Sequence, residues 1–109
     1  RFFHGRCGNS GCIQMPLDHP SMQRALGHYR EMWTRSFQGF LAAAGPGDFI
    51  SFNPEILHPS INYAPVSRQA DGTYAEASDR WVDAQTMTMM AKECFAEAQR
   101  RQAGVAIGR

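Results

Sequence analysis

The stretch Gly47-Asp48-Phe49-Ile50-Ser51-Phe52-Asn53-Pro54-Glu55 decides the fold class of this chain. Aromatic and β-branched residues fill its middle, which favours a β-strand, and glycine and proline punctuate its ends. Side chains alternate along a strand, so Ser51, Asn53 and Glu55 share one face. We predict a strand that is buried on both faces and carries a carboxylate at its C-terminal tip. This is the arrangement by which α/β barrels position catalytic groups.

The segments on either side of this strand alternate in the same way. Phe2–Cys7 has strand character, with His4 and Arg6 on one face. Apolar residues then recur at helical spacing from about residue 20 to about residue 44, and again from about 79 to about 102. Strands that alternate with long helices indicate parallel βαβ units. For the second helix we predict an apolar stripe of Trp81, Ala84, Thr88, Ala91, Phe95 and Ala98, widened by Met87, Met90 and Cys94.

Local signals set the ends of the helices and the nature of the loops. Asp18 or His19 suits the N-cap of the first helix, and Ser78 suits that of the second. The long connection from about residue 56 to about residue 78 contains the turn signal Asp71-Gly72, which predicts a small hairpin. A connection of this length in a compact fold is typical of a lid or a binding loop.

Composition restricts the class of protein. Of the 109 residues, 43% are hydrophobic and 19% charged, and the formal net charge is +1, as in a globular domain without an electrostatic footprint for nucleic acid or acidic membranes. Cys7, Cys12 and Cys94 lack the paired spacing of a zinc site, so we expect free thiols in a reducing cytoplasm. No apolar run approaches the length of a membrane span.

A unit of two strands and two helices is not a closed fold. Two parallel strands would leave open edges and an uncovered face. We therefore expect residues 1–109 to be a single partial domain of a longer chain, which supplies further strands.

The candidate reactive groups lie at the C-terminal ends of the two strands. If the strands are neighbours, His4 and Glu55 can share a divalent metal ion, with Mn²⁺, Co²⁺, Mg²⁺ or Zn²⁺ suited to such ligands. Two ligands hold a metal poorly, so more would have to come from other strands. His58, in the loop three residues after Glu55, is a further candidate for a substrate contact. The alternative is structural: His4 hydrogen-bonded in the fold, Glu55 solvated, and Arg6 paired with Glu55.

Three short motifs carry a family resemblance: Phe3-His4-Gly5-Arg6-Cys7-Gly8, Gln14-Met15-Pro16 and Phe52-Asn53-Pro54-Glu55. Together they resemble the last quarter of a sugar isomerase/epimerase TIM barrel of the xylose-isomerase-like superfamily. The resemblance covers most of the chain and implies the seventh strand and helix, the eighth strand, a long loop and the eighth helix of a (β/α)8 barrel.

The resemblance also implies roles for individual residues. His4 and Glu55 would be metal ligands, together with a glutamate and an aspartate from earlier strands. Glu55 would also move a proton on a carbon beside the sugar carbonyl, while the metal stabilises the enediolate. Arg6 would hold a substrate oxygen or phosphate, and Gln14 a hydroxyl.

The expected activity is thus isomerisation or epimerisation of a sugar or sugar phosphate by a cytoplasmic enzyme of carbohydrate metabolism. Two alternatives stay open. One is a metal-dependent hydrolase on the same barrel, such as a phosphodiesterase or endonuclease, which additional upstream histidine ligands would favour. The other is a degenerate, non-catalytic barrel, which an upstream sequence without acidic strand ends would favour. The expected partner is a small sugar, with no nucleic acid and no membrane; a second copy of the chain is the other partner considered.

Overall fold

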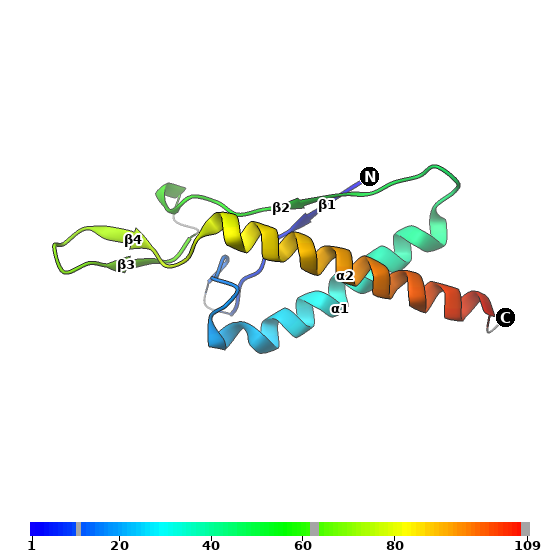
Figure 1. Cartoon of the computed structure of the whole chain (residues 1–109), viewed down its shortest axis with the longest axis horizontal. Helices are drawn as coiled ribbons and strands as arrows, with labels where there is room; N and C mark the ends of the chain where they lie inside the picture. Colours follow the sequence, from blue (N-terminus) through cyan, green and yellow to red (C-terminus); the bar gives the residue numbers. More distant parts are fainter. Residues whose placement is uncertain (11, 62–63, 108–109) are drawn as a thin grey trace.

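The protein is a mixed α/β structure built from two long helices and two small sheets, as a computed structural model shows (Figure 1). The structure describes residues 1–10, 12–61 and 64–107. In chain order the elements are β1 (Phe2–Gly5), the 3-10 turn η1 (Pro20–Met22), α1 (Gln23–Ala43), β2 (Ser51–Pro54), the 3-10 turn η2 (Pro59–Ile61), β3 (Val66–Arg68), β4 (Tyr74–Glu76) and α2 (Arg80–Ile107). The molecule is elongated, 63 × 26 × 19 Å, and the β3–β4 hairpin projects from one end. The predicted α/β class and the order of the main elements are therefore confirmed.

The strands β1 and β2 lie side by side and run parallel, which confirms the predicted βαβ unit. Phe3 is the register partner of Phe52, and His4 that of Asn53. Phe3 and Phe52 turn towards α1, where both rings pack against Trp33 with centroid separations of 5.9 and 5.2 Å. The carboxyl ends of both strands point towards the hairpin end of the molecule (Figure 1).

The opposite face of this sheet carries no helix in the described part of the chain, so the prediction of a strand buried on both faces is wrong. Ser51 and Asn53 on β2 are exposed, and Phe49 lies outside the strand with 74% of its surface exposed. The physical reason is that both helices pack against one face, so the alternation of β2 separates a covered side from a bare one.

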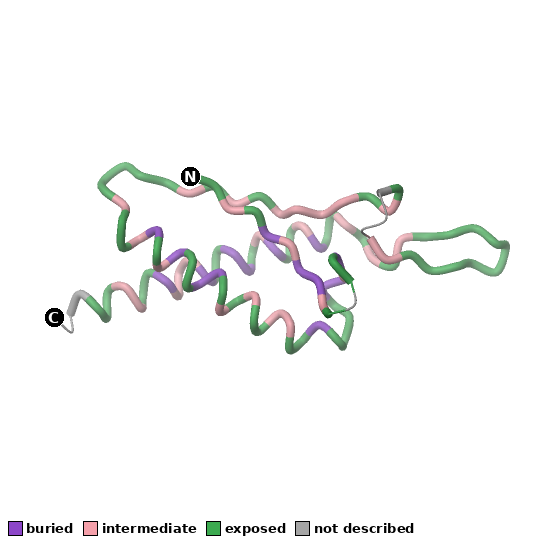
Figure 2. Tube along the Cα trace, turned by 180° about the vertical axis from the view of Figure 1, so that it is seen from behind, coloured by how far each residue is buried: buried purple, intermediate pink, exposed green. Residues whose placement is uncertain are grey.

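The hydrophobic core lies where α1 and α2 cross beneath the sheet, and Figure 2 shows the buried residues along their facing sides. Trp33 and Phe37 of α1 meet a row of small and sulfur-containing residues on α2: Met87, Met90, Ala91, Cys94 and Ala98. Trp81 is 82% exposed, so its predicted place in the core stripe is wrong. It lies six residues before Met87, which at about 100° per residue turns it about 120° away from the core side.

The helix caps differ in part from the sequence expectation. The Nδ1 atom of His19 accepts a hydrogen bond from the Ser21 amide at 3.2 Å and caps the 3-10 turn η1. The predicted cap of the first helix is therefore present only at this turn, since α1 itself begins after Met22, which makes no side-chain cap hydrogen bond. At α2 the cap is Asp79, whose Oδ1 accepts from the Trp81 amide at 2.9 Å. Ser78, which we predicted as the cap, instead donates its hydroxyl to the carboxylate of Asp83, five residues further along the chain, at 2.6 Å.

The predicted hairpin in the long connection is confirmed. Strands β3 and β4 pair antiparallel, with Val66 opposite Glu76. Gly72 takes the turn with a φ of +86°, a backbone conformation that glycine adopts without steric cost. Across the described residues, neither helix is long and apolar enough to cross a membrane.

Candidate functional site

The parallel pairing of β1 and β2 brings His4, Arg6 and Glu55 together. The strand ladder continues one residue beyond β2, because the Glu55 amide donates to the Gly5 carbonyl at 2.7 Å. Glu55 then points to the bare face of the sheet, as His4 and Arg6 do. The Nδ1 atom of His4 lies 3.6 Å from Oε2 of Glu55, and the Arg6 guanidinium donates from Nη2 to Oε1. The predicted convergence of these side chains is therefore present.

This group is accessible but ordered by its own contacts. The exposed fractions of the side chains are 52% for His4, 36% for Glu55 and 23% for Arg6. The two oxygens of Glu55 have different partners, since Oε1 is held by Arg6 and Oε2 faces His4. Oε2 is thus the oxygen that is placed to contact a ligand on the bare face.

The spacing of His4 and Glu55 suits two ligands of one divalent ion. Nitrogen and oxygen ligands lie about 2.0–2.2 Å from such ions, so two atoms bound to the same ion are separated by about 3 to 3.6 Å. The observed 3.6 Å between Nδ1 and Oε2 falls at the upper end of this range. Within residues 1–10, 12–61 and 64–107 there is no cluster of three or more histidine, cysteine, aspartate or glutamate side chains that could hold a metal. The described residues therefore contain two candidate ligands at this place and no complete set.

Gln14 has a different place from the one expected for a residue that contacts substrate. It is buried, with 6% of its surface exposed, in the loop between β1 and η1. Its Nε2 donates to the Leu57 carbonyl at 3.0 Å, and its Oε1 accepts from the Leu57 amide at 2.7 Å. One N–H and one lone pair of the amide remain, so a bond from Gln14 to a substrate hydroxyl stays a prediction.

His58 belongs to a second polar group that the sequence did not indicate. Its Nδ1 accepts from the Ser60 amide at 3.1 Å, and its Nε2 lies 3.8 Å from Oε1 of Glu76. Arg80 donates to the other oxygen of Glu76 at 2.8 Å, and this hydrogen bond is the main cause that lowers the pKa of Glu76. The group ties the base of the hairpin to α2 and to the loop after β2. A substrate contact by His58 stays a prediction.

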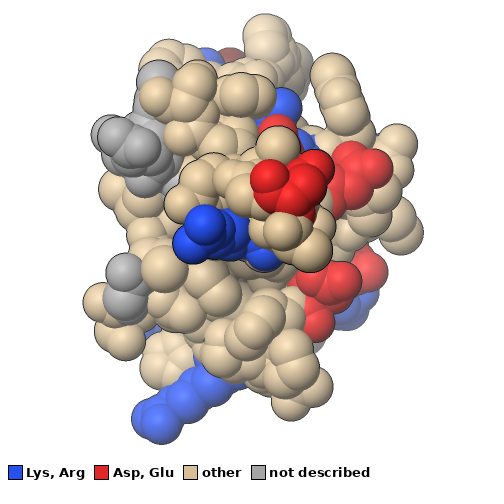
Figure 3. Space-filling view, turned by 90° about the vertical axis from the view of Figure 1, so that its left-hand side faces the viewer, with Lys and Arg blue, Asp and Glu red and all other residues tan. Residues whose placement is uncertain are grey.

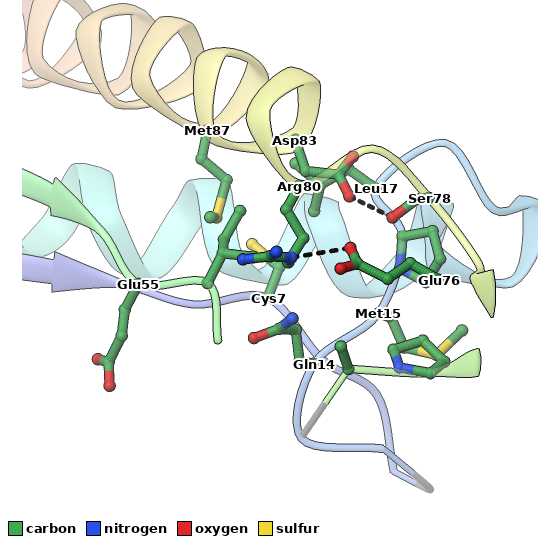
Figure 4. A pocket seen from close by; sticks show the side chains of 14 residues that line it. Cys7, Gln14, Met15, Leu17, Glu55, Glu76, Ser78, Arg80, Asp83 and Met87 are labelled. Atoms are coloured by element: carbon green, nitrogen blue, oxygen red, sulfur yellow. Dashed lines mark hydrogen bonds and ion pairs between the residues drawn. The ribbon is translucent and has the colours of Figure 1, made fainter. Parts of the chain in front are cut away.

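A small cavity lies between these two groups, and Figure 4 shows the side chains that line it. Its volume of about 10 Å3 is close to the minimum for a single water molecule, so it is not a substrate pocket. The Glu55 carboxylate points away from it (Figure 4). Burial and then the charge of Asp83 raise the pKa of the Cys7 thiol in its wall to about 12, which removes Cys7 as a nucleophile at neutral pH. The accessible chemistry is on the bare face of the sheet.

The chain matches no protein-family model, no curated protein and no solved structure in the comparisons made. At the hairpin end of the molecule, acidic and basic side chains lie beside one another (Figure 3). This face therefore shows no patch of a single charge that would point to a charged partner. The geometry of the His4–Arg6–Glu55 group therefore carries the functional argument.

Proposed function

We propose that this chain supplies the His4–Arg6–Glu55 part of the active site of a divalent-metal-dependent isomerase or epimerase that acts on a sugar or sugar phosphate within a TIM barrel. One observation carries the proposal. At the carboxyl end of a parallel strand pair, on the face without a helix, the Glu55 carboxylate lies between His4 and Arg6. Catalytic groups of α/β barrels occupy this position.

Glu55 is the proton carrier in this proposal. Its carboxylate accepts a proton from the carbon beside the substrate carbonyl, and the electron pair of the broken C–H bond moves to form an enediolate. For isomerisation, Glu55 returns the proton to the former carbonyl carbon, while the hydroxyl proton of the carbon that lost its hydrogen passes to the former carbonyl oxygen. For epimerisation, Glu55 keeps the proton that it removed, and a different proton reaches the same carbon from the opposite face. A second acid/base group outside this chain completes the epimerisation.

Arg6 and His4 fix the geometry of that proton transfer. The guanidinium of Arg6 holds Oε1, which leaves Oε2 aimed at the space beside His4, and a guanidinium at this place is of the chemical type that binds a substrate oxygen or phosphate. His4 and Glu55 would hold the divalent ion, for which Mn²⁺, Co²⁺, Mg²⁺ and Zn²⁺ are candidates. When bound, such an ion polarises the carbonyl and hydroxyl oxygens of the substrate.

The test is a comparison of Glu55→Gln with Glu93→Gln in the full-length protein. Glu93 is an exposed glutamate on α2 that pairs with Arg30, so it is a control for loss of a carboxylate. We expect Glu55→Gln to lower aldose–ketose or epimer turnover by about 10²- to 10⁴-fold, the usual contribution of a general acid/base, and to weaken Mn²⁺ binding. Glu93→Gln should change neither.

Other outcomes would reject the proposal. Unchanged turnover and metal affinity in Glu55→Gln would remove Glu55 from the site. Metal-dependent cleavage of phosphodiesters without sugar turnover would favour the hydrolase alternative. A wild-type protein that neither binds a divalent ion nor turns over sugars would favour a non-catalytic barrel.

A further inference from the structure

We infer that Gln14 is a positioning residue for Glu55, because its side-chain amide fixes the chain immediately beyond the catalytic carboxylate. The inference rests on the role proposed for Glu55 and adds a residue on which that role depends. It starts from the two hydrogen bonds between Gln14 and the backbone of Leu57, two residues after Glu55.

The Gln14 amide provides hydrogen bonds to the backbone just beyond the point where the β1–β2 ladder ends. The last backbone bond between the two strands is the one from the Glu55 amide to the Gly5 carbonyl, at 2.7 Å. Two residues later, both polar backbone groups of Leu57 are bonded to one side chain, at 2.7 and 3.0 Å. A primary amide presents a donor and an acceptor side by side, as a peptide group does, so it can continue the pairing.

Gln14 is itself firmly held. The amide of the next residue, Met15, donates to the Cys7 carbonyl at 3.0 Å, which ties this part of the loop to the chain directly after β1. The Gln14 side chain is also buried. The amide thus links the segment that follows β1 to the segment that follows β2.

Glu55 consequently lies between two fixed points. Its own amide is bonded to Gly5 and the residue two positions later is bonded to Gln14, while Ile56 between them packs against the hydrophobic core. Few backbone dihedrals remain free to redirect the Glu55 side chain. This restriction keeps the carboxylate between His4 and Arg6, and a misplacement of about 1 Å in a catalytic group can cost about 10²-fold in rate.

The experiment compares Gln14→Met with Gln99→Met in the full-length protein, and measures amide hydrogen exchange and turnover. Methionine keeps the length of glutamine but forms no such bonds, and Gln99 is an exposed control on α2. We expect Gln14→Met to speed exchange at both Leu57 and Glu55, by about tenfold or more at Glu55, and to leave the core amides of Met90 and Cys94 unchanged. The kcat should fall by about 10- to 100-fold, as for other residues that orient a catalytic group, while KM stays nearly constant. Gln99→Met should change none of these values.

Two results would overturn the inference. The first is faster exchange at Leu57 alone, with Glu55 unchanged. The second is a raised KM with an unchanged kcat, which would make Gln14 a substrate contact. If wild type shows no sugar turnover, the proposed function fails, and exchange at Glu55 still decides whether Gln14 positions it.

A second variant separates hydrogen bonding from packing. Gln14→Glu keeps the shape of the side chain, but the ionised carboxylate cannot donate to the Leu57 carbonyl. The neutral acid offers a donor and an acceptor again, so protection of the Glu55 amide relative to wild type should recover as the pH falls and the new carboxyl takes up a proton. No recovery at low pH would overturn the positioning role.

Discussion

The Nδ1 atom of His4 faces Oε2 of Glu55 at 3.6 Å across the end of the parallel strand pair. His4 lies on β1 and Glu55 directly follows β2, so the parallel register of the two strands brings the two residues together. The pair is the part of the proposed metal site that this chain contains. Removal of either side chain should therefore weaken metal binding, and this loss can be measured without an assay of turnover.

We predict that His4→Asn weakens Mn²⁺ or Co²⁺ binding by more than about tenfold, since it removes a ligand from a small set. Isothermal titration of the full-length protein measures the change. His28→Asn is the matched control, because His28 is an exposed histidine on α1. Equal affinities in the two variants would show that His4 is not a ligand.

The ion pair between the two helices predicts a dependence of stability on pH. Arg101 donates to both oxygens of Glu31 at 3.0 Å, and these bonds, followed by the one from Arg35, lower the pKa of Glu31 to about 2. The unfolded value is about 4.3, so the stabilisation is complete above that pH and is lost as the pH falls through about 2. Because the pair is partly exposed, solvent and salt weaken it.

The measurement is the Tm of wild type and of Glu31→Gln between pH 7 and about pH 2. At pH 7 and low ionic strength the variant should melt below wild type. The difference should shrink between about pH 4.3 and pH 2, as the wild-type carboxyl takes up a proton. A gap that is constant with pH would mean that Glu31 acts through packing and not through its charge.

Two glycine substitutions should change stability in opposite directions. A Cβ on Gly5 would lie 2.5 Å from the Phe52 ring and 2.9 Å from the Trp33 ring, so Gly5→Ala should cost about 1–3 kcal/mol by overpacking. A Cβ on Gly27 of α1 meets nothing within 4 Å, so Gly27→Ala should stabilise by up to about 1 kcal/mol through helix propensity. Urea unfolding measures both, and a Gly5→Ala protein as stable as wild type would mean that the two rings repack without strain.

The sequence predicted those parts of the structure that depend on local pattern. The alternation of side chains along each strand predicted that Glu55 shares a face with His4 and Arg6. The alternation of strands with long helices along the chain predicted that the two strands run parallel. The same rules failed for Trp81. Alanine and methionine occur on several sides of α2, so helical spacing alone does not show which apolar side faces the core. They also favoured Ser78 over its neighbour Asp79 as the cap, although both residue types suit that position.

The contacts that the sequence did not predict join segments that are far apart in the chain. The bond from Gln14 to Leu57 requires the loop after β1 to fold back on itself, which no periodicity encodes. The group of His58, Glu76 and Arg80 depends on where the hairpin meets α2. The barrel itself stays a proposal, since the described strands form only pairs.

The division of the β1–β2 sheet into a covered face and a bare face has a consequence for how such a protein can change over generations. The residues that hold the fold, such as Phe3 and Phe52, point to the helices, whereas His4, Asn53 and Glu55 point away from them. A substitution on the bare face removes little packing against the two helices, so among the described residues it should alter the chemistry at little cost to the contacts that hold α1 and α2 on the sheet. New specificities can thus arise there by single steps, without compensating changes in the core between α1 and α2.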